Sequence, residues 1–277
     1  MKKLLLFLLL TFSINSIAQI PVDEYRKEIK ALKSENQIFV YWNEIKRIDQ
    51  EILLNSSNQN TFDSISISNM IRTALLFEIQ GENLYKPNIT VPILNLSHNY
   101  NIQSNVSFWP IIEKCKSIGG IIESFGGEFP AYPLESVALT SYNYSLMNEK
   151  ERLPYLREQL LKHDSYSIVK ELASTFEEVK RREELEILEK LDKWKNEPIK
   201  NFYENGYFEL VRMSDNSFYF LRNERITKLN KIEKEDYNLL ILEKDPFNWY
   251  YKYFHDGKLS LFDQNDEIMI EYSKIDK

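Results

Sequence analysis

The chain has 277 residues, of which 42 are acidic and 35 are basic, so its formal net charge is −7. Phosphate binding needs clustered Lys and Arg, and a mildly acidic chain without a basic block argues against nucleic acid as the main partner. Aromatic residues make up 13% of the chain, which argues against intrinsic disorder and indicates a packed core.

The first 18 residues have the pattern of a secretory signal peptide. Two lysines at positions 2 and 3 precede an apolar run over 4–12, and small residues stand at positions 16 and 18. The apolar run is shorter than the roughly 20 residues that span a bilayer, so we expect no transmembrane segment after cleavage. We predict cleavage before Gln19 and export to the periplasm or the extracellular space. No cysteine follows Ala18, so a lipid anchor is not expected.

Apolar residues at helical spacing predict three helices at the start of the mature chain. They cover residues 22–34 and 38–54 and a third segment that ends near Gly81, a residue type typical of helix ends. The following residues, 82–106, lack a clear period, and Val91–Leu96 fits either a short strand or a buried helical turn.

Four of the seven glycines lie in two pairs, Gly119-Gly120 and Gly126-Gly127. Paired glycines allow positive φ and are typical of tight turns. We therefore predict a short helix that begins at Pro110, a turn, a buried strand over Ile121–Phe125 and a second turn.

A long helix is predicted from Ser165 to about Glu197, because Leu185, Leu188, Leu191 and Trp194 continue the apolar stripe of its first half. Pro198 ends that pattern. From Tyr207 onward, short segments rich in aromatic and branched residues alternate with Asp-Gly and Asn-Asp turns, which is typical of an antiparallel meander.

These patterns predict an α+β fold. A mainly helical N-terminal domain with one short buried strand covers residues 19–198. A small antiparallel β-meander domain, sandwich or barrel-like, covers 206–274.

Common catalytic motifs are absent from the sequence, including Gly-x-Ser-x-Gly, His-Glu-x-x-His and the Walker A loop. A structural zinc site needs four clustered Cys or His ligands, and the whole chain supplies one cysteine and three histidines, so we predict no metal and no cofactor. Cys115 falls on the apolar side of its predicted helix, where a thiol is inert.

Of the histidines, His163 lies at a predicted helix end and His255 in a hairpin turn. His98, in the segment without a period, is the candidate base or ligand.

Three polar positions between residues 41 and 118 resemble the landmarks of a family of uncharacterised bacterial helical domains. They are Asp49, which Gln50 follows on one helix, Asn69 on the next, and His98. The arginine expected shortly after the Asp-Gln pair is missing. The resemblance implies a polar cluster of Asp49, Asn69 and His98 and no known activity. The leader and the richness in Asn, Ile, Lys, Glu and Tyr resemble exported proteins of Bacteroidota.

The densest aromatic cluster lies near the C-terminus, where strand alternation places Trp249, Tyr251 and Tyr253 on one face. Cross-strand packing explains such a cluster. An exposed platform for a sugar or peptide is the functional alternative.

Three hypotheses about function follow. The first is an exported, non-catalytic binding protein with an unknown protein, peptide or glycan partner, which the missing catalytic motifs favour. The second is an exported hydrolase-type enzyme that uses His98 with Asp49 and Asn69. It predicts that His98 lies within hydrogen-bond distance of Asp49 in a concave pocket. The third is a small-ligand carrier, which requires a cavity in the β domain.

Overall fold

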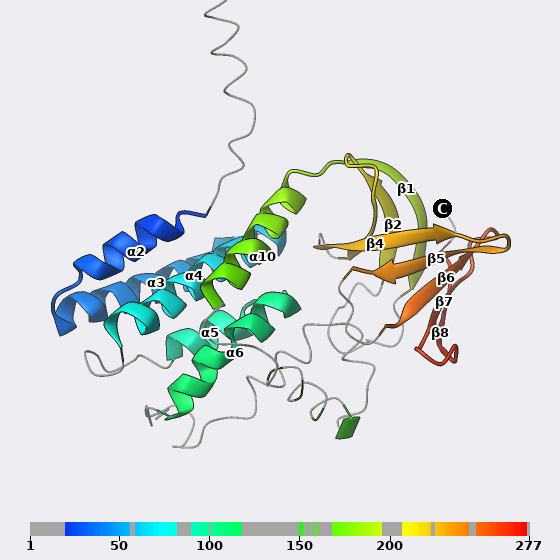
Figure 1. Ribbon diagram of the computed structural model, residues 1–277. Coiled ribbons are helices and arrows are strands. Elements are labelled where there is room, and N and C mark those ends of the chain that lie inside the picture. The colour runs from blue at the N-terminus through cyan, green and yellow to red at the C-terminus, as the bar shows by residue number, and fades with distance from the viewer. Residues whose placement is uncertain are drawn as a thin grey trace, which may run out of the picture.

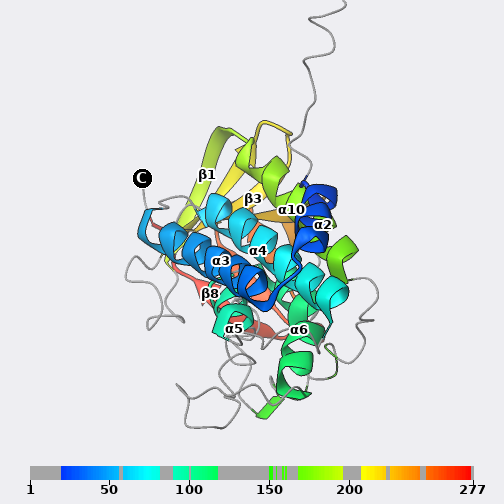
Figure 2. The same cartoon turned by 90° about the vertical axis from the view of Figure 1, so that its left-hand side faces the viewer.

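The structure, a computed structural model, describes residues 20–55, 59–81, 90–99, 101–117, 168–195, 207–222, 225–243 and 248–275, and single positions at 150, 151, 154, 158 and 160. The described residues form an α+β fold in which helices precede an eight-stranded antiparallel sheet, as the sequence predicts (Figure 1). The helices lie to one side of the sheet, and Figure 2 shows them in front of it. The predicted strand over Ile121–Phe125 and both glycine turns lie outside the described residues.

The helical part is arranged around helix α4 (Gln59–Gln80). This helix packs against α2 (Val22–Ala31), α3 (Glu35–Asn55), α5 (Thr90–Ser97), α6 (Ile102–Ser117) and α10 (Ile168–Glu183). A helix that is apolar on most sides is typically buried. Accordingly, the buried side chains of α4 cover most of its circumference: Phe62, Ile67, Met70, Ile71, Ala74, Leu75, Leu76 and Phe77.

The outer helices each bury one apolar stripe against this centre. In α10 the stripe consists of Ile168, Leu172, Phe176 and Val179, as the spacing predicts. In α3 it consists of Ile38, Trp42 and Ile45. Their opposite faces carry charged pairs such as Arg47 with Glu51.

The two helices after α4 settle one open prediction and correct another. Residues 91–96 belong to helix α5, which resolves the choice between a strand and a helical turn. Helix α6 begins at Ile102, so Pro110 lies inside it and not at its first position. A proline inside a helix removes one backbone hydrogen bond, and packing on the apolar side, where Phe108, Ile111 and Ile112 are buried, keeps the helix continuous.

The long helix predicted over 165–197 is wrong in its second half. Helix α10 ends at Glu183, and residues Ile187–Lys195 form strand β1. Register shifts interrupt the pairing of β1 between Ile187 and Glu189 and again between Lys190 and Asp192. Such bulges break strict alternation, so the apolar residues of β1 recur at a spacing of three that resembles a helix. The sheet therefore begins before the predicted change at 198–206.

The remaining strands form a simple meander in which each strand pairs with the next in the sequence. They are β2 (Tyr207–Met213), β3 (Phe218–Arg222), β4 (Arg225–Glu233), β5 (Tyr237–Leu242), β6 (Tyr250–Phe254), β7 (Leu259–Phe262) and β8 (Ile268–Tyr272). Three of the tight turns contain a residue with positive φ, namely Asn216, Gly257 and Asp266. These turns confirm the predicted turn signals.

The sheet curls so that its first strand, β1, pairs with the residues that follow its last strand, β8. The backbone N–H of Lys195 donates to the carbonyl of Ser273 at 2.9 Å, and that of Ile275 donates to the carbonyl of Lys193 at 2.8 Å. The residues after β8 thus pair with the second half of β1. At this end the concave face is filled by aromatic rings: Trp194, Phe208, Phe220, Tyr251 and Tyr272. The sheet is therefore a partly closed barrel with a packed interior at one end.

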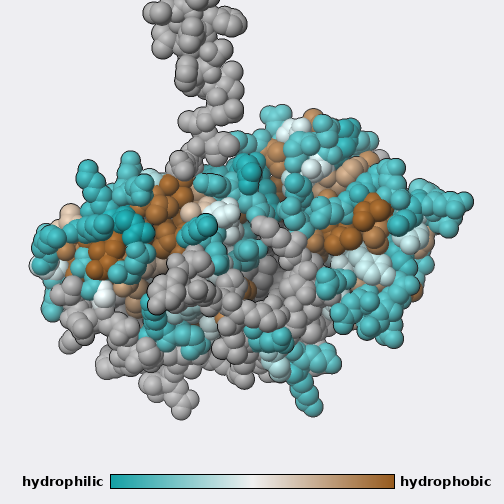
Figure 3. Space-filling view, viewed as in Figure 1, coloured by the Kyte–Doolittle hydropathy of each residue, from teal (hydrophilic) through white to brown (hydrophobic). Residues whose placement is uncertain are grey.

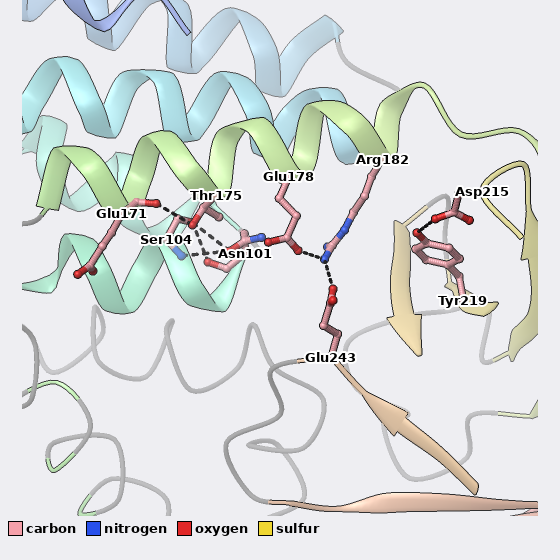
Figure 4. A network of polar contacts seen from close by, with 9 residues as sticks. All are labelled: Asn101, Ser104, Glu171, Thr175, Glu178, Arg182, Asp215, Tyr219 and Glu243. Atoms are coloured by element: carbon pink, nitrogen blue, oxygen red, sulfur yellow. Dashed lines mark hydrogen bonds and ion pairs between the residues drawn. The ribbon is translucent and has the colours of Figure 1, made fainter. Parts of the chain in front are cut away.

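The helices and the sheet are joined at the end of α10. The guanidinium of Arg182 forms ion pairs with Glu178, one turn earlier, and with Glu243 after β5, at 3.7 Å (Figure 4). One cluster of buried apolar side chains includes residues of both parts. The division into two independently folding domains remains a prediction.

Candidate functional site

Asp49 occupies a core position of helix α3. It follows Ile38, Trp42 and Ile45 at helical spacing, and only 2% of its surface is exposed. Burying a carboxylate among apolar side chains is costly unless hydrogen bonds compensate. The contacts of Asp49 therefore decide what this residue does.

The main partner of Asp49 is His98. The atoms His98 Nδ1 and Asp49 Oδ2 are 2.8 Å apart, and Gln50 Nε2 donates to the same oxygen at 2.9 Å. His98 directly follows α5, and its backbone N–H donates to the carbonyl of Leu94 in the last turn. Helices α3 and α5 thus bring together two residues that are 49 positions apart.

The geometry assigns different roles to the two imidazole nitrogens of His98. A carboxylate only accepts hydrogen bonds, so Nδ1 of His98 carries a proton, and in the neutral form of the ring Nε2 presents a lone pair. Nε2 has no hydrogen-bond partner within the described part of the chain. The His98 side chain is 22% exposed, whereas that of Asp49 is 1% exposed. A buried carboxylate that orients a partly exposed histidine is the arrangement of a general base.

Asn69, the third expected residue, is also buried, on helix α4. Its hydrogen bonds in the structure do not include Asp49 or His98, and its amide Nδ2 has no partner among the described residues. The structure therefore brings two of the three predicted residues into direct contact, and within the described residues no hydrogen bond joins the third to them.

The sequence analysis did not identify a polar layer between α4, α5 and α6. Thr73 donates to Asn95 at 2.9 Å, and Asn99 donates to Ser104 at 2.5 Å. Asn105 donates to the backbone carbonyl of Asn99 at 2.8 Å. All five residues are buried. In a chain rich in Asn and Ser their spacing is not distinctive, and only the packing of the helices shows that they face inward.

Cys115 is buried on α6, as predicted. Burial raises the pKa of its thiol to about 12. A thiol in this state is protonated at neutral pH, so Cys115 is not a nucleophile for a pair with His98.

The aromatic cluster does not form an exposed platform. Trp249 and Tyr251 are buried, and Tyr253 is half-buried with its hydroxyl donating to Asp192 at 2.7 Å. The reason is strand alternation, which turns Tyr251 and Tyr253 toward the concave face of the sheet. Of the three candidates, Tyr253 contributes to a hollow in that face.

Within the described residues, no group of three or more His, Cys, Asp or Glu side chains could hold a metal ion. Nor does any helix of that part combine the length and apolar character needed to cross a bilayer. Comparisons with models of protein families, with curated proteins and with solved structures find no match. The resemblance of residues 41–118 to uncharacterised bacterial domains is therefore carried by its polar landmarks alone.

Proposed function

We propose that this protein is exported and that its helical part carries a proton-transfer site in which Asp49 orients His98 as a general base for hydrolysis. The hydrogen bond between His98 Nδ1 and the buried Asp49 carboxylate is the observation that carries this proposal. The charged and apolar pattern of the first 18 residues supports export. A concave pocket around His98 remains a prediction of the same hypothesis.

Packing alone does not explain Asp49. A leucine at this position would continue the apolar stripe of α3 without the cost of burying a carboxylate. Retaining a costly polar pair is typical of functional sites, where the group is needed for chemistry. Nε2 of the partly exposed ring, which has no hydrogen-bond partner among the described residues, is then the atom that takes a proton from water or a substrate hydroxyl.

The first experiment tests the tautomer without a substrate. A long-range ¹H–¹⁵N NMR spectrum of the mature protein should show His98 protonated at Nδ1 and not at Nε2. In Asp49→Leu this preference should disappear. A neutral ring protonated at Nε2 in the wild type would contradict the proposed base.

The second experiment tests catalysis. The mature protein is assayed against chromogenic esters, phosphomonoesters, peptides and glycosides. His98→Gln should lower kcat by about 10²- to 10⁴-fold, the usual contribution of a general base. His255→Gln is the matched control, since this exposed histidine lies in a hairpin turn of the sheet, where its ring forms a hydrogen bond with the backbone carbonyl of Glu235. Circular dichroism verifies that both variants fold. Activity that survives His98→Gln, or no turnover of any class, would refute the proposal.

A non-catalytic binding protein is the second candidate. Phe39 and Val40 are adjacent apolar residues on α3. They lie outside its buried stripe and are 58% and 57% exposed. In the view of Figure 3, apolar surface gathers over the helices on the left and over the sheet on the right. Exposed apolar patches are typical of protein-binding surfaces. If His98→Gln lowers stability but changes no activity, the Asp49–His98 pair only holds α3 against α5, and this second function is favoured.

A further inference from the structure

The concave face of the sheet contains a hollow of about 220 Å³. Strand register places the lining residues on one face of the sheet. Arg212 lies opposite Phe218, and Lys231 lies opposite Leu240. Leu240 in turn lies opposite Tyr251, one of the aromatic rings of the packed end. The complete lining is Glu189, Leu191, Leu210, Arg212, Phe218, Lys231, Leu240 and Tyr253.

The floor of the hollow is apolar and fixed in position. Leu210 and Leu240 are buried, and the Tyr253 hydroxyl donates to Asp192 of β1 at 2.7 Å. Asp192 also pairs with Lys274 at 2.8 Å, in the segment that closes the barrel. These contacts link β6, β1 and the C-terminal segment, and the fully buried Trp194 lies in the same packed end. The hollow therefore lies next to the packed aromatic end, on the same face of the sheet.

The rim carries more positive than negative charge. Arg212 and Lys231 line the hollow together with one acid, Glu189. Arg212 pairs with Glu189 at 3.1 Å, and Lys231 pairs with Glu233, whose side chain is 79% exposed. Exposed pairs of this kind contribute little and can exchange for another anion. The ammonium of Lys231 also lies 4.7 Å from the ring centre of Phe218, so the cation is held at the wall.

We propose that this hollow binds a small amphipathic carboxylate. The apolar chain or ring lies on Leu210, Leu240 and Tyr253, and the carboxylate pairs with Lys231 and Arg212. A dry apolar cavity of about 150 Å³ holds benzene, so 220 Å³ holds about nine non-hydrogen atoms. Heptanoate, with seven carbons and two oxygens, matches that size. Drug-sized ligands require about 300 Å³ or more.

The test is calorimetric titration of the full mature chain with heptanoate. 1-Heptanol and heptylamine serve as probes of the same chain length without a negative charge. Saturable binding of heptanoate, at least tenfold tighter than that of both probes, is expected. Equal binding of heptanol, or no binding of heptanoate up to about 10 mM, the range of very weak ligands, would overturn the proposal.

Two variants of one strand separate the rim from general charge effects. Lys231→Glu should weaken heptanoate binding at least tenfold. Lys228→Glu makes the same charge change on the opposite face of β4. Lys228 lies opposite Tyr219, whereas Lys231 lies opposite Leu240 of the hollow. The Lys228 variant should therefore change the affinity for heptanoate less than twofold. Lys231→Gln gives a milder variant if the glutamate disturbs folding. Equal effects of Lys231→Glu and Lys228→Glu would refute a binding site at this rim. His98→Gln should bind heptanoate like the wild type, so this test is independent of the proposed helical site.

Discussion

Replacing Trp194 with alanine tests whether the segment after α10 is a strand of the barrel. Trp194 is fully buried, and its Nε1 donates to the carbonyl of Gly257 at 2.9 Å. Its ring centre lies 5.6 Å from those of both Phe208 and Tyr253. Removing a buried tryptophan of this kind costs about 3–5 kcal/mol. For a chain of this size, that loss lowers the melting temperature by roughly 6–20 °C.

The matched control is Leu188→Ala in the same strand. Leu188 is 53% exposed, so this change should alter the free energy of unfolding by less than about 0.5 kcal/mol. The helical interpretation of 165–197 gives a different result, since it places both residues on one buried stripe and predicts comparable losses. Urea unfolding followed by far-UV circular dichroism measures both variants without relying on Trp194 fluorescence. Losses of similar size in both, or less than about 1 kcal/mol for Trp194→Ala, would refute the assignment of β1.

Two further predictions concern a turn and the thiol. Gly257 has φ +86°, a conformation that L side chains rarely adopt, and a Cβ there would also displace the flexible end of Lys274, which pairs with Asp192, so Gly257→Ala should destabilise by more than ~1 kcal/mol. Gly81→Ala, at φ +68° with open space around it, should cost less, and equal melting temperatures for the two variants would contradict this contact. Cys115 should not react with a thiol reagent in the folded protein, because burial raises the pKa of its thiol to about 12. It should react in urea, and rapid labelling of the native state would show that the thiol is accessible.

The candidate site was predicted only in part from the sequence. His98 was distinctive because it is one of three histidines and lies in a segment without a clear period. Asp49 was singled out only by the resemblance of the Asp49-Gln50 pair to landmarks of an uncharacterised family. Their contact at 2.8 Å depends on how α5 packs across α3, which no local pattern encodes. Asn69 shows the limit of the same reasoning, because the resemblance places it in the cluster and, within the described residues, no hydrogen bond joins it to the pair.

The sequence by itself determined the fold class, the first three helices and most of the strands. From Tyr207 onward the structure has the predicted meander of short antiparallel strands separated by turns. These elements follow from local physics, since turn residues and apolar periods act within a few positions. Only the tertiary structure decided that 187–195 is a strand and that the residues after β8 close the barrel against it. Both outcomes depend on hydrogen bonds between segments far apart in the chain, and these bonds override the local helical spacing around Trp194.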